Sequence, residues 1–234
     1  MPAKTQSKAT PLPLKEGRVA RKRRDVRLRL LRAAFPLVAE KGIEHVSISD
    51  ITADADCAVG SFYSFFETKE VLMQTLIEEA LEPLGQAMDT YAETSADAAD
   101  AVSVAQRYTI ELALHEPMWG RFLLQASTSF ELDKVGLLER VFRDIQRGME
   151  EGVFTCTDVL AATRVVGGTI IAGILSANIK GSSAQTGERS TEYVLRALGV
   201  PARKAQKLSV RPLPNIRLSS ALLDFTPSPY KGSS

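Results

Sequence analysis

The residues best suited to bind a partner lie in one stretch, SISDITADADCAVGSFYSFF, which runs from Ser47 to Phe66 and is closely followed by Lys69. The stretch offers several hydroxyl groups, a tyrosine and, just beyond it, a lysine. Hydroxyl groups, helix N-termini and lysine ammonium groups all bind phosphate oxygens. The stretch therefore predicts contacts with the backbone of a nucleic acid.

Signatures of catalysis are missing from the sequence. It contains no Gly-rich phosphate loop, no G-x-S-x-G motif and no H-E-x-x-H motif, and His45 and His115 are its two histidines. The two cysteines, Cys57 and Cys156, lack metal-ligand spacing, so we expect neither a disulfide framework nor a zinc site. Cys57 could sense redox state, although small apolar packing suits it better. We predict no enzyme activity, no cofactor and no metal.

Ser47 and Asp50 fit a capping box, in which a serine and an acid three residues later satisfy the first N–H groups of a helix. The apolar residues of that helix share one face, namely Ile48, Ile51 and Ala55. Asp56 follows where the pattern stops, and aspartate tolerates a left-handed backbone better than most residues. These features predict a short helix and then a tight turn at Asp56.

A second helix is predicted from Val59 to Phe65. Phe62 and Phe66 are four residues apart and should face inward. The outward positions are then Ser61, Tyr63, Ser64 and Phe65. Two helices joined by a short turn form a helix-turn-helix, whose second helix fits the DNA major groove.

The net charge of +1 is unevenly distributed over the 234 residues. Residues 1–32 hold 11 Lys or Arg and 2 Asp or Glu, whereas residues 33–234 hold 18 and 26. A basic segment on an acidic body is typical of a protein that meets a polyanion at one end. We predict a mobile arm over residues 1–22 that reaches DNA, and a plain solvated tail is the alternative.

The pattern from Arg23 to Lys41 predicts a helix, with Gly42 as its C-terminal stop. Its inner stripe comprises Val26, Leu30, Ala34, Leu37 and Val38. Pro36 lies inside this helix, where it should cost about 3 kcal/mol or force a kink. The hydrophobic content of 44% is enough for a buried core in one large domain or two small ones.

The run from Ala39 to Leu72 resembles the DNA-binding domain of the TetR family of bacterial transcriptional regulators. The shared features are Gly42, Ser47, Ile51, the cluster Gly60-Ser61-Phe62-Tyr63, Phe66, Lys69, Glu70 and Leu72. The resemblance implies an all-α fold, with an N-terminal three-helix helix-turn-helix head over residues 23–68 and a larger C-terminal helical ligand-binding and dimerisation body over residues 69–200. Residues 201–234 would form a C-terminal extension.

The second helix of the motif departs from the family pattern at several positions. Asp56 stands where glycine is usual, Cys57 where valine is usual, Ala58 in place of a capping serine, Val59 in place of a basic residue and Phe65 in place of a histidine. This helix is therefore poor in hydrogen-bonding groups. Base readout would depend on Ser61, Ser64 and apolar contacts with thymine methyl groups.

The resemblance implies that Tyr63, Lys69, Ser47 and Ser49 bind phosphates. The full set predicted to bind double-stranded DNA is Ser47, Ser49, Val59, Gly60, Ser61, Tyr63, Ser64, Phe65 and Lys69, together with Arg21, Lys22 and Arg24. Two alternatives stay open: Tyr63 could be a half-buried ring, and Lys69 with Glu70 could be ordinary surface charge.

Four helical patterns follow the motif, over residues 69–91, 101–115, 117–126 and 132–151, and Pro83 should bend or break the first of them. Their aromatic and polar residues could line a pocket for a small apolar or amphipathic effector. The candidates are Tyr108, His115, Trp119, Phe122, Phe130, Phe142 and Met149. Plain core packing is the somewhat better supported alternative for the apolar members, and a lone histidine is more often structural.

The segment 157–179 is apolar and dense in small residues, including Gly167 and Gly168. Mid-helix glycines cost about 1 kcal/mol each, which makes sense where another backbone approaches closely. By resemblance, helices near 157–179 and 188–198 pair with their twins in a homodimer, whose two heads would sit one DNA turn apart. A buried core helix is the alternative.

The N-terminus lacks the apolar region of a signal peptide, and the uncharged run 165–179 is shorter than a membrane span. We therefore expect a cytoplasmic protein without membrane contact. The leading hypothesis is a dimeric repressor that binds a palindromic operator and is released by a small effector. The alternatives are an effector-independent DNA-binding protein and, with less support, a helical enzyme that uses His115.

Overall fold

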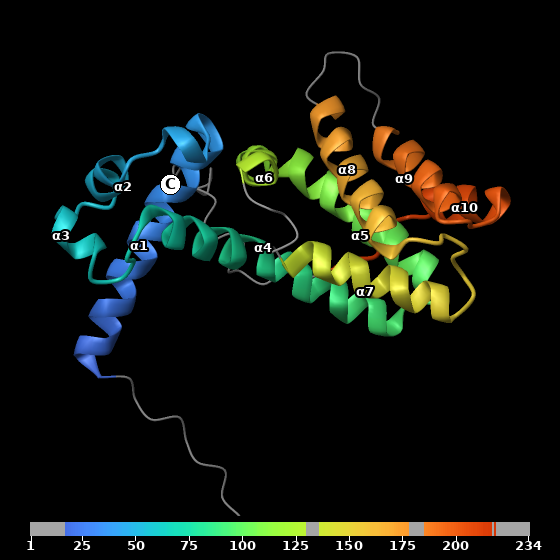
Figure 1. The fold of residues 1–234 in the computed structure, drawn as a ribbon, viewed down its shortest axis with the longest axis horizontal. Coiled ribbons are helices and arrows are strands. Elements are labelled where there is room, and N and C mark those ends of the chain that lie inside the picture. The colour runs from blue at the N-terminus through green and yellow to red at the C-terminus, as the bar shows by residue number, and fades with distance from the viewer. Residues whose placement is uncertain (1–16, 130–135, 178–184, 217, 219–234) are drawn as a thin grey trace, which may run out of the picture.

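The computed structural model describes residues 17–129, 136–177, 185–216 and 218, and within these ranges every regular element is a helix. A small N-terminal head is joined by the long helix α4 to a larger body of packed helices (Figure 1). The predicted all-α architecture of head and body is therefore confirmed. Residues 1–16, residues 217 and 219–234 of the C-terminal extension, and Phe130 lie outside the described residues.

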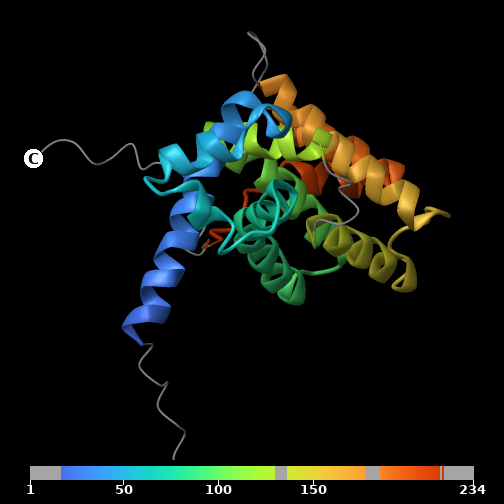
Figure 2. The same ribbon diagram turned by 60° about the vertical axis from the view of Figure 1, so that its left-hand side comes forward.

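Helix α1 (Arg18–Lys41) begins five residues before its predicted start. The prediction of a mobile arm as far as residue 22 is thus wrong for residues 18–22, which are helical. These first turns extend beyond the rest of the head (Figures 1 and 2). The helix continues through Pro36 and ends at Gly42, whose φ of 82° and N–H bond to the Val38 carbonyl (2.9 Å) confirm the predicted stop.

The head continues with the 3-10 helix η1 (Ile43–His45) and helix α2 (Ile48–Asp54). The predicted capping box is confirmed, because the Asp50 N–H donates to Ser47 Oγ (3.1 Å) and the Ser47 N–H donates to Asp50 Oδ2 (3.0 Å). The predicted turn residue Asp56 has a φ of 48°, and among the described residues it is the one non-glycine with positive φ.

Helix α3 (Val59–Phe62) is shorter than predicted. Beyond Phe62 the chain tightens, with N–H groups of Ser64 and Phe65 bonded to carbonyls three residues back. Ala58 supplies no side-chain cap, and the alternation of small and aromatic residues gives the helix little intrinsic stability. Its inward aromatics hold it instead: Phe62 and Phe66 are buried, with ring centroids 5.8 Å apart.

Helix α4 (Lys69–Thr94) starts at Thr68, whose hydroxyl accepts the Val71 N–H (3.3 Å). It runs from the head into the body and passes Pro83 without ending, so of the two expected outcomes, a bend or a break, the break does not occur. Because proline has no N–H, the Glu79 carbonyl lacks its usual helical donor at this point.

The body contains α5 (Ala98–His115), α6 (Pro117–Ser129), α7 (Gly136–Glu150), α8 (Val159–Ala177), α9 (Thr186–Ala197) and α10 (Ala202–Ser209). One core is continuous from the head into α4, α5 and α6, where Phe35 of α1 stacks on Phe122 of α6 with ring centroids 4.5 Å apart. A second core joins α5, α7, α8, α9 and α10. The head is therefore packed directly on α6 as well as carried by α4.

The residues after α10 pack across the body without regular secondary structure, and we call the segment Val210–Ile216 the strap. Its arginine, Arg211, bonds to the buried Asp100 of α5 and to the Tyr91 hydroxyl of α4 (3.1 Å). Tyr108 donates from its hydroxyl to the Ile216 carbonyl (3.1 Å), and Ile216 packs against the larger core. The described residues after Arg211 form no helix or strand.

Candidate nucleic-acid interface and internal cavity

The helix-turn-helix presents most of its predicted contact residues to solvent. Tyr63 is 57% exposed and lies just after α3, and its ring stands edge-on to Phe62 at 5.3 Å. The other exposed members of the set are Ser47, Ser49, Val59, Gly60 and Ser64, with Ser61 partly exposed. An exposed face of hydroxyl, glycine and aromatic groups on a short helix can approach a phosphate backbone closely.

Two predicted contact residues lie differently from the expectation. Phe65 is half-buried, with the Arg23 guanidinium 5.7 Å from its ring centroid, so it does not point outward as predicted. Lys69 is also half-buried, and its Nζ donates to the Ile43 carbonyl (3.3 Å). Lys69 therefore ties the start of α4 to η1, whatever else it binds.

Three arginines of α1 hold the helix-turn-helix in place, a role that the sequence reasoning missed. Arg23 donates to the Ser64 carbonyl (3.4 Å) and Arg29 to the Asp56 carbonyl (3.4 Å). Arg27 is part-buried, pairs with Glu79 of α4 at 2.6 Å and lies 5.7 Å from the Phe66 ring centroid. The signal available was the spacing of four between Arg23 and Arg27, which places both on one face of α1.

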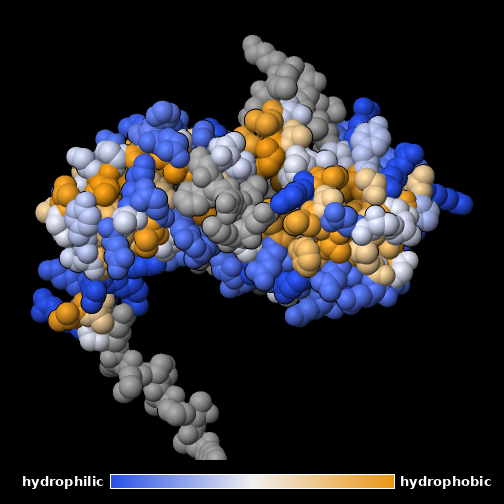
Figure 3. All heavy atoms as spheres, viewed as in Figure 1, coloured by the Kyte–Doolittle hydropathy of each residue, from blue (hydrophilic) through white to orange (hydrophobic). Residues whose placement is uncertain are grey.

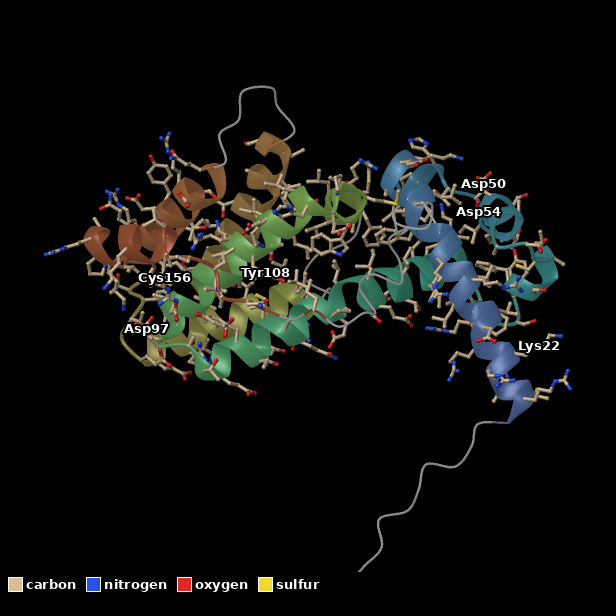
Figure 4. All side chains as sticks on the ribbon, turned by 180° about the vertical axis from the view of Figure 1, so that it is seen from behind. Lys22, Asp50, Asp54, Asp97, Tyr108 and Cys156 are labelled. Carbon is tan, nitrogen blue, oxygen red and sulfur yellow. The ribbon has the colours of Figure 1, made fainter. Side chains whose placement is uncertain are left out.

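The three basic residues predicted to bind DNA from the N-terminal segment, Arg21, Lys22 and Arg24, are all exposed. They lie on the projecting turns of α1, and Lys22 is seen there in Figure 4, at the end of the molecule that carries Asp50 and Asp54 of α2. Because the segment is helical, these cations have a fixed spacing. They would run along a phosphate backbone as one face of a helix.

A cavity of about 90 Å³, partly open to solvent, lies between α4, α5, α6, α7 and α8. Its apolar wall is formed by Leu81, Met88, Val102, Ala105, Leu123, Leu137, Leu138, Val141, Val166, Gly167, Ile170 and Ile171. Four polar side chains complete it: Gln106, Thr109, Arg140 and Asp144. An adjoining hollow of about 440 Å³ shares Leu81, Leu137 and Arg140 with the cavity.

Gln106 is the most telling polar group in the cavity wall. It is completely buried, and its Nε2 donates to Thr169 Oγ1 (3.1 Å). Its Oε1 has no hydrogen-bond partner within the described part of the chain. A buried acceptor without a partner destabilises the folded protein. A ligand or water that donates a hydrogen bond to this oxygen would therefore bind more favourably.

Arg140 and Asp144 form the charged corner of the cavity. Arg140 donates to Asp89 (2.8 Å) and to Glu82 (3.0 Å), both on α4, and Arg143 also donates to Asp89 (3.0 Å). Burial raises the pKa of Asp144 and the nearby Asp89 raises it further, against the opposing charges of the neighbouring arginines. Asp144 is thus an acid that desolvation holds closer to its neutral form than an exposed aspartate.

The cavity does not coincide with the residues predicted to bind an effector. Trp119 and Phe122 are completely buried in the core that joins head and body. Tyr108 and Phe142 are half-buried, Met149 packs against the second core, and Phe130 lies outside the described residues. Figure 4 shows Tyr108 within the body, and its hydroxyl is used by the strap.

The remaining predicted pocket residue, His115, ends α5 with an exposed side chain 3.7 Å from Glu111. The sequence reasoning favoured large aromatic residues, whereas medium-sized aliphatic residues line the cavity. Within the described ranges no group of three His, Cys, Asp or Glu side chains is placed to hold a metal.

Helix α8 carries an exposed seam of small and apolar residues, which we call the α8 seam: Ala161, Val165, Gly168, Ala172 and Leu175. The spacing of four and three residues keeps them on one face, and Leu175 is 52% exposed. On α9, Tyr193 is 65% exposed.

Helix α8 is also long and apolar enough, by length and composition alone, to cross a bilayer. In its apolar segment Val159–Ser176, 28% of the residues are buried in the protein. In Figure 3 hydrophobic residues gather in patches on the body, above a hydrophilic lower edge.

The helix-turn-helix head, the linking helix α4 and the helical body with an internal cavity together define a DNA-binding transcriptional regulator of the two-domain, all-helical class. Residues 30–76 match the family model "Bacterial regulatory proteins, tetR family", and residues 97–211 match "Tetracyclin repressor-like, C-terminal domain". The chain belongs to the TetR family.

Among solved structures, the chain is similar to RolR in complex with resorcinol, with 34% identity and a TM-score of 0.67, covering 85% of this chain and 100% of RolR. FadR from Bacillus subtilis in complex with stearoyl-CoA shares the fold, with a TM-score of 0.60 at 21% identity over 75% of this chain and 98% of FadR.

Among sequence relatives, the chain is 32% identical to the regulator EthR of Mycobacterium tuberculosis over 40% of this chain and 44% of EthR. It is 40% identical to the uncharacterised regulator YvdT of Bacillus subtilis over 23% of this chain and 27% of YvdT. The matched part therefore spans less than half the length of these two relatives.

Proposed function

We propose that this regulator is a dimeric, cytoplasmic repressor that binds a palindromic operator and is released by a small-molecule effector. The observation that carries the proposal is the cavity, whose largely apolar wall includes the buried side chain of Gln106 with its unpartnered Oε1. Leu81 and Met88 of the cavity wall belong to α4, which runs into the DNA-binding head. A ligand in the cavity can thus favour one position of the head over another and shift the population that binds DNA.

The effector that best suits the cavity is a small phenol. The volume of about 90 Å³ is smaller than the roughly 150 Å³ of a cavity that binds benzene, so one ring is the largest group the cavity can take, and its lining side chains must move slightly to admit it. The Gln106 oxygen accepts a hydroxyl hydrogen, and the acid of Asp144 offers a second polar partner across the cavity. RolR, which is similar to this chain over its whole length, was solved in complex with resorcinol. We therefore assign a phenolic effector to this cavity.

Resorcinol and a panel of monohydric and dihydric phenols test the effector assignment. At 100 times its Kd, the effector should stabilise the protein by about 2.7 kcal/mol in thermal unfolding and should weaken its binding to DNA. Gln106→Leu removes the acceptor at nearly constant volume and should weaken phenol binding about tenfold, whereas Gln146→Leu, on the exposed face of α7, should not. Stable, salt-dependent DNA binding that no phenol alters would support the effector-independent alternative.

Tyr63→Ala should weaken binding to any duplex DNA about 30-fold, because each protomer of the dimer loses roughly 1 kcal/mol of phosphate contact. The measurement is fluorescence anisotropy with two unrelated duplexes and with DNA upstream of the protein's own gene. Tyr63→Phe separates the hydroxyl from the ring. It keeps the ring, and if the hydroxyl binds phosphate it should weaken DNA binding nearly as much as Tyr63→Ala does. Wild-type binding by the alanine variant would exclude this docking face.

A further inference from the structure

Arg140 crosses over the backbone of α4 at one particular residue, Gly85. A Cβ atom built at Gly85 would overlap the Arg140 guanidinium, so any other residue there displaces it. At Gly85 the Arg140 guanidinium bonds to Glu82, which precedes Gly85 on α4 (3.0 Å), and to Asp89, which follows it (2.8 Å). One guanidinium therefore holds α4 at two points about two turns apart, and the arginine side chain itself is only 16% exposed. We call the contacts of Arg140 with Glu82 and Asp89 the clamp.

The contacts of Arg140 span a weak point of α4, Pro83. Pro83 deprives the Glu79 carbonyl of its helical donor, which is the usual cause of a hinge in a long helix. On the head side of this hinge, Glu79 is held by Arg27 of α1 at 2.6 Å. Thus the head binds α4 just before Pro83, and Arg140 of α7 binds α4 on both sides of Pro83, at Glu82 and at Asp89.

Arg140 also forms part of the cavity wall, next to Asp144. We propose that Arg140 is the positioning residue that couples the cavity to the DNA-binding head. With the cavity empty, its clamp on Glu82 and Asp89 fixes α4 in the DNA-binding geometry. A hydroxyl-bearing effector draws the guanidinium away from α4, which then pivots at Pro83. This inference rests on the proposed function and adds the element that transmits the signal.

Gly85→Ala tests the clamp without changing a cavity residue. The variant should bind DNA about 5- to 150-fold more weakly than wild type without effector, the range of typical coupling between two sites. By reciprocity it should bind resorcinol more tightly, and resorcinol should change its DNA affinity less. Gly187→Ala is the matched control, since a Cβ there meets only Ile110 at an ordinary 3.7 Å.

A second variant and an intrinsic probe separate the clamp from misfolding. Glu82→Gln should reproduce the effect in weaker form, and Glu78→Gln, whose described bond is to Gln74 on the same helix, should not. Trp119 is the single tryptophan, and its Nε1 donates to the Ala80 carbonyl of α4 (3.3 Å), so its emission reports the position of α4. Emission should shift in Gly85→Ala at wild-type helix content.

The outcomes separate the clamp from the effector assignment. If resorcinol leaves wild type on DNA while Gly85→Ala still weakens DNA binding and shifts Trp119 emission, the effector assignment fails and the clamp stands. If wild type responds to resorcinol and Gly85→Ala matches it in DNA affinity, emission and response, the clamp is overturned.

Discussion

Replacing Gly168 by glutamate should convert the proposed dimer to monomers and lower operator affinity at least about 100-fold. The loss follows from avidity, because a dimer places two helix-turn-helix units on one palindrome and multiplies affinity by about 10²–10⁴. A Cβ at Gly168 meets no atom within 4 Å in its own protomer, so the new side chain fits the monomer. A second α8 seam packed on this one would have to desolvate two opposed carboxylates.

Analytical ultracentrifugation measures the oligomeric state of Gly168→Glu, and anisotropy measures its DNA binding. Thr90→Glu is the matched control, since it adds the same charge to an exposed face of α4, away from the α8 seam. A dimer of normal stability in Gly168→Glu would remove α8 from the proposed interface.

Removing the charge of the strap should produce the largest loss of stability. Arg211 is the ion-pair partner of Asp100, whose side chain is only 5% exposed. Arg211→Met leaves that carboxylate with the Tyr91 hydroxyl (3.1 Å) and the Ala96 N–H (3.3 Å). Breaking a buried pair on one side costs about 3–5 kcal/mol, which corresponds to a fall in Tm of roughly 6–20 °C for a chain of this size.

The double variant Asp100→Asn with Arg211→Met separates the lost pair from lost packing of the strap. Without the buried charge, the double variant should recover a large part of the stability in urea unfolding, because the remaining donors can satisfy a neutral amide. Additive losses in the double variant would show instead that Arg211 acts through packing alone.

Helix caps and turns could be predicted from the sequence wherever a few adjacent residues decide the backbone conformation. The capping box of Ser47 and Asp50, the left-handed turn at Asp56 and the stop at Gly42 depend on a few adjacent residues, and all three predictions are confirmed. Helix lengths were less predictable. The second helix of the motif stops at Phe62 because burial of its aromatics, not helix propensity, sets its course.

The cavity could not be predicted from the sequence. It is the space that the side chains of several packed helices leave unfilled, and that space depends on how the helices pack. Trp119 and Phe122 were reasonable candidates by size, but the approach of α6 to α1 and α4 places both in the core. The cavity is lined instead by aliphatic residues of five helices, and Gln106 becomes informative only once its oxygen is known to be buried without a partner.

The sequence alone determined the class of this protein, because the periodicity, caps and turn of the helix-turn-helix are local and occur in order along the chain. The tertiary structure decided which residues carry the connection between body and head. Arg27 with Glu79 and Arg140 with Asp89 are each about 50 residues apart in sequence. Side chains at such separations meet only through helix packing, and no local pattern encodes that packing.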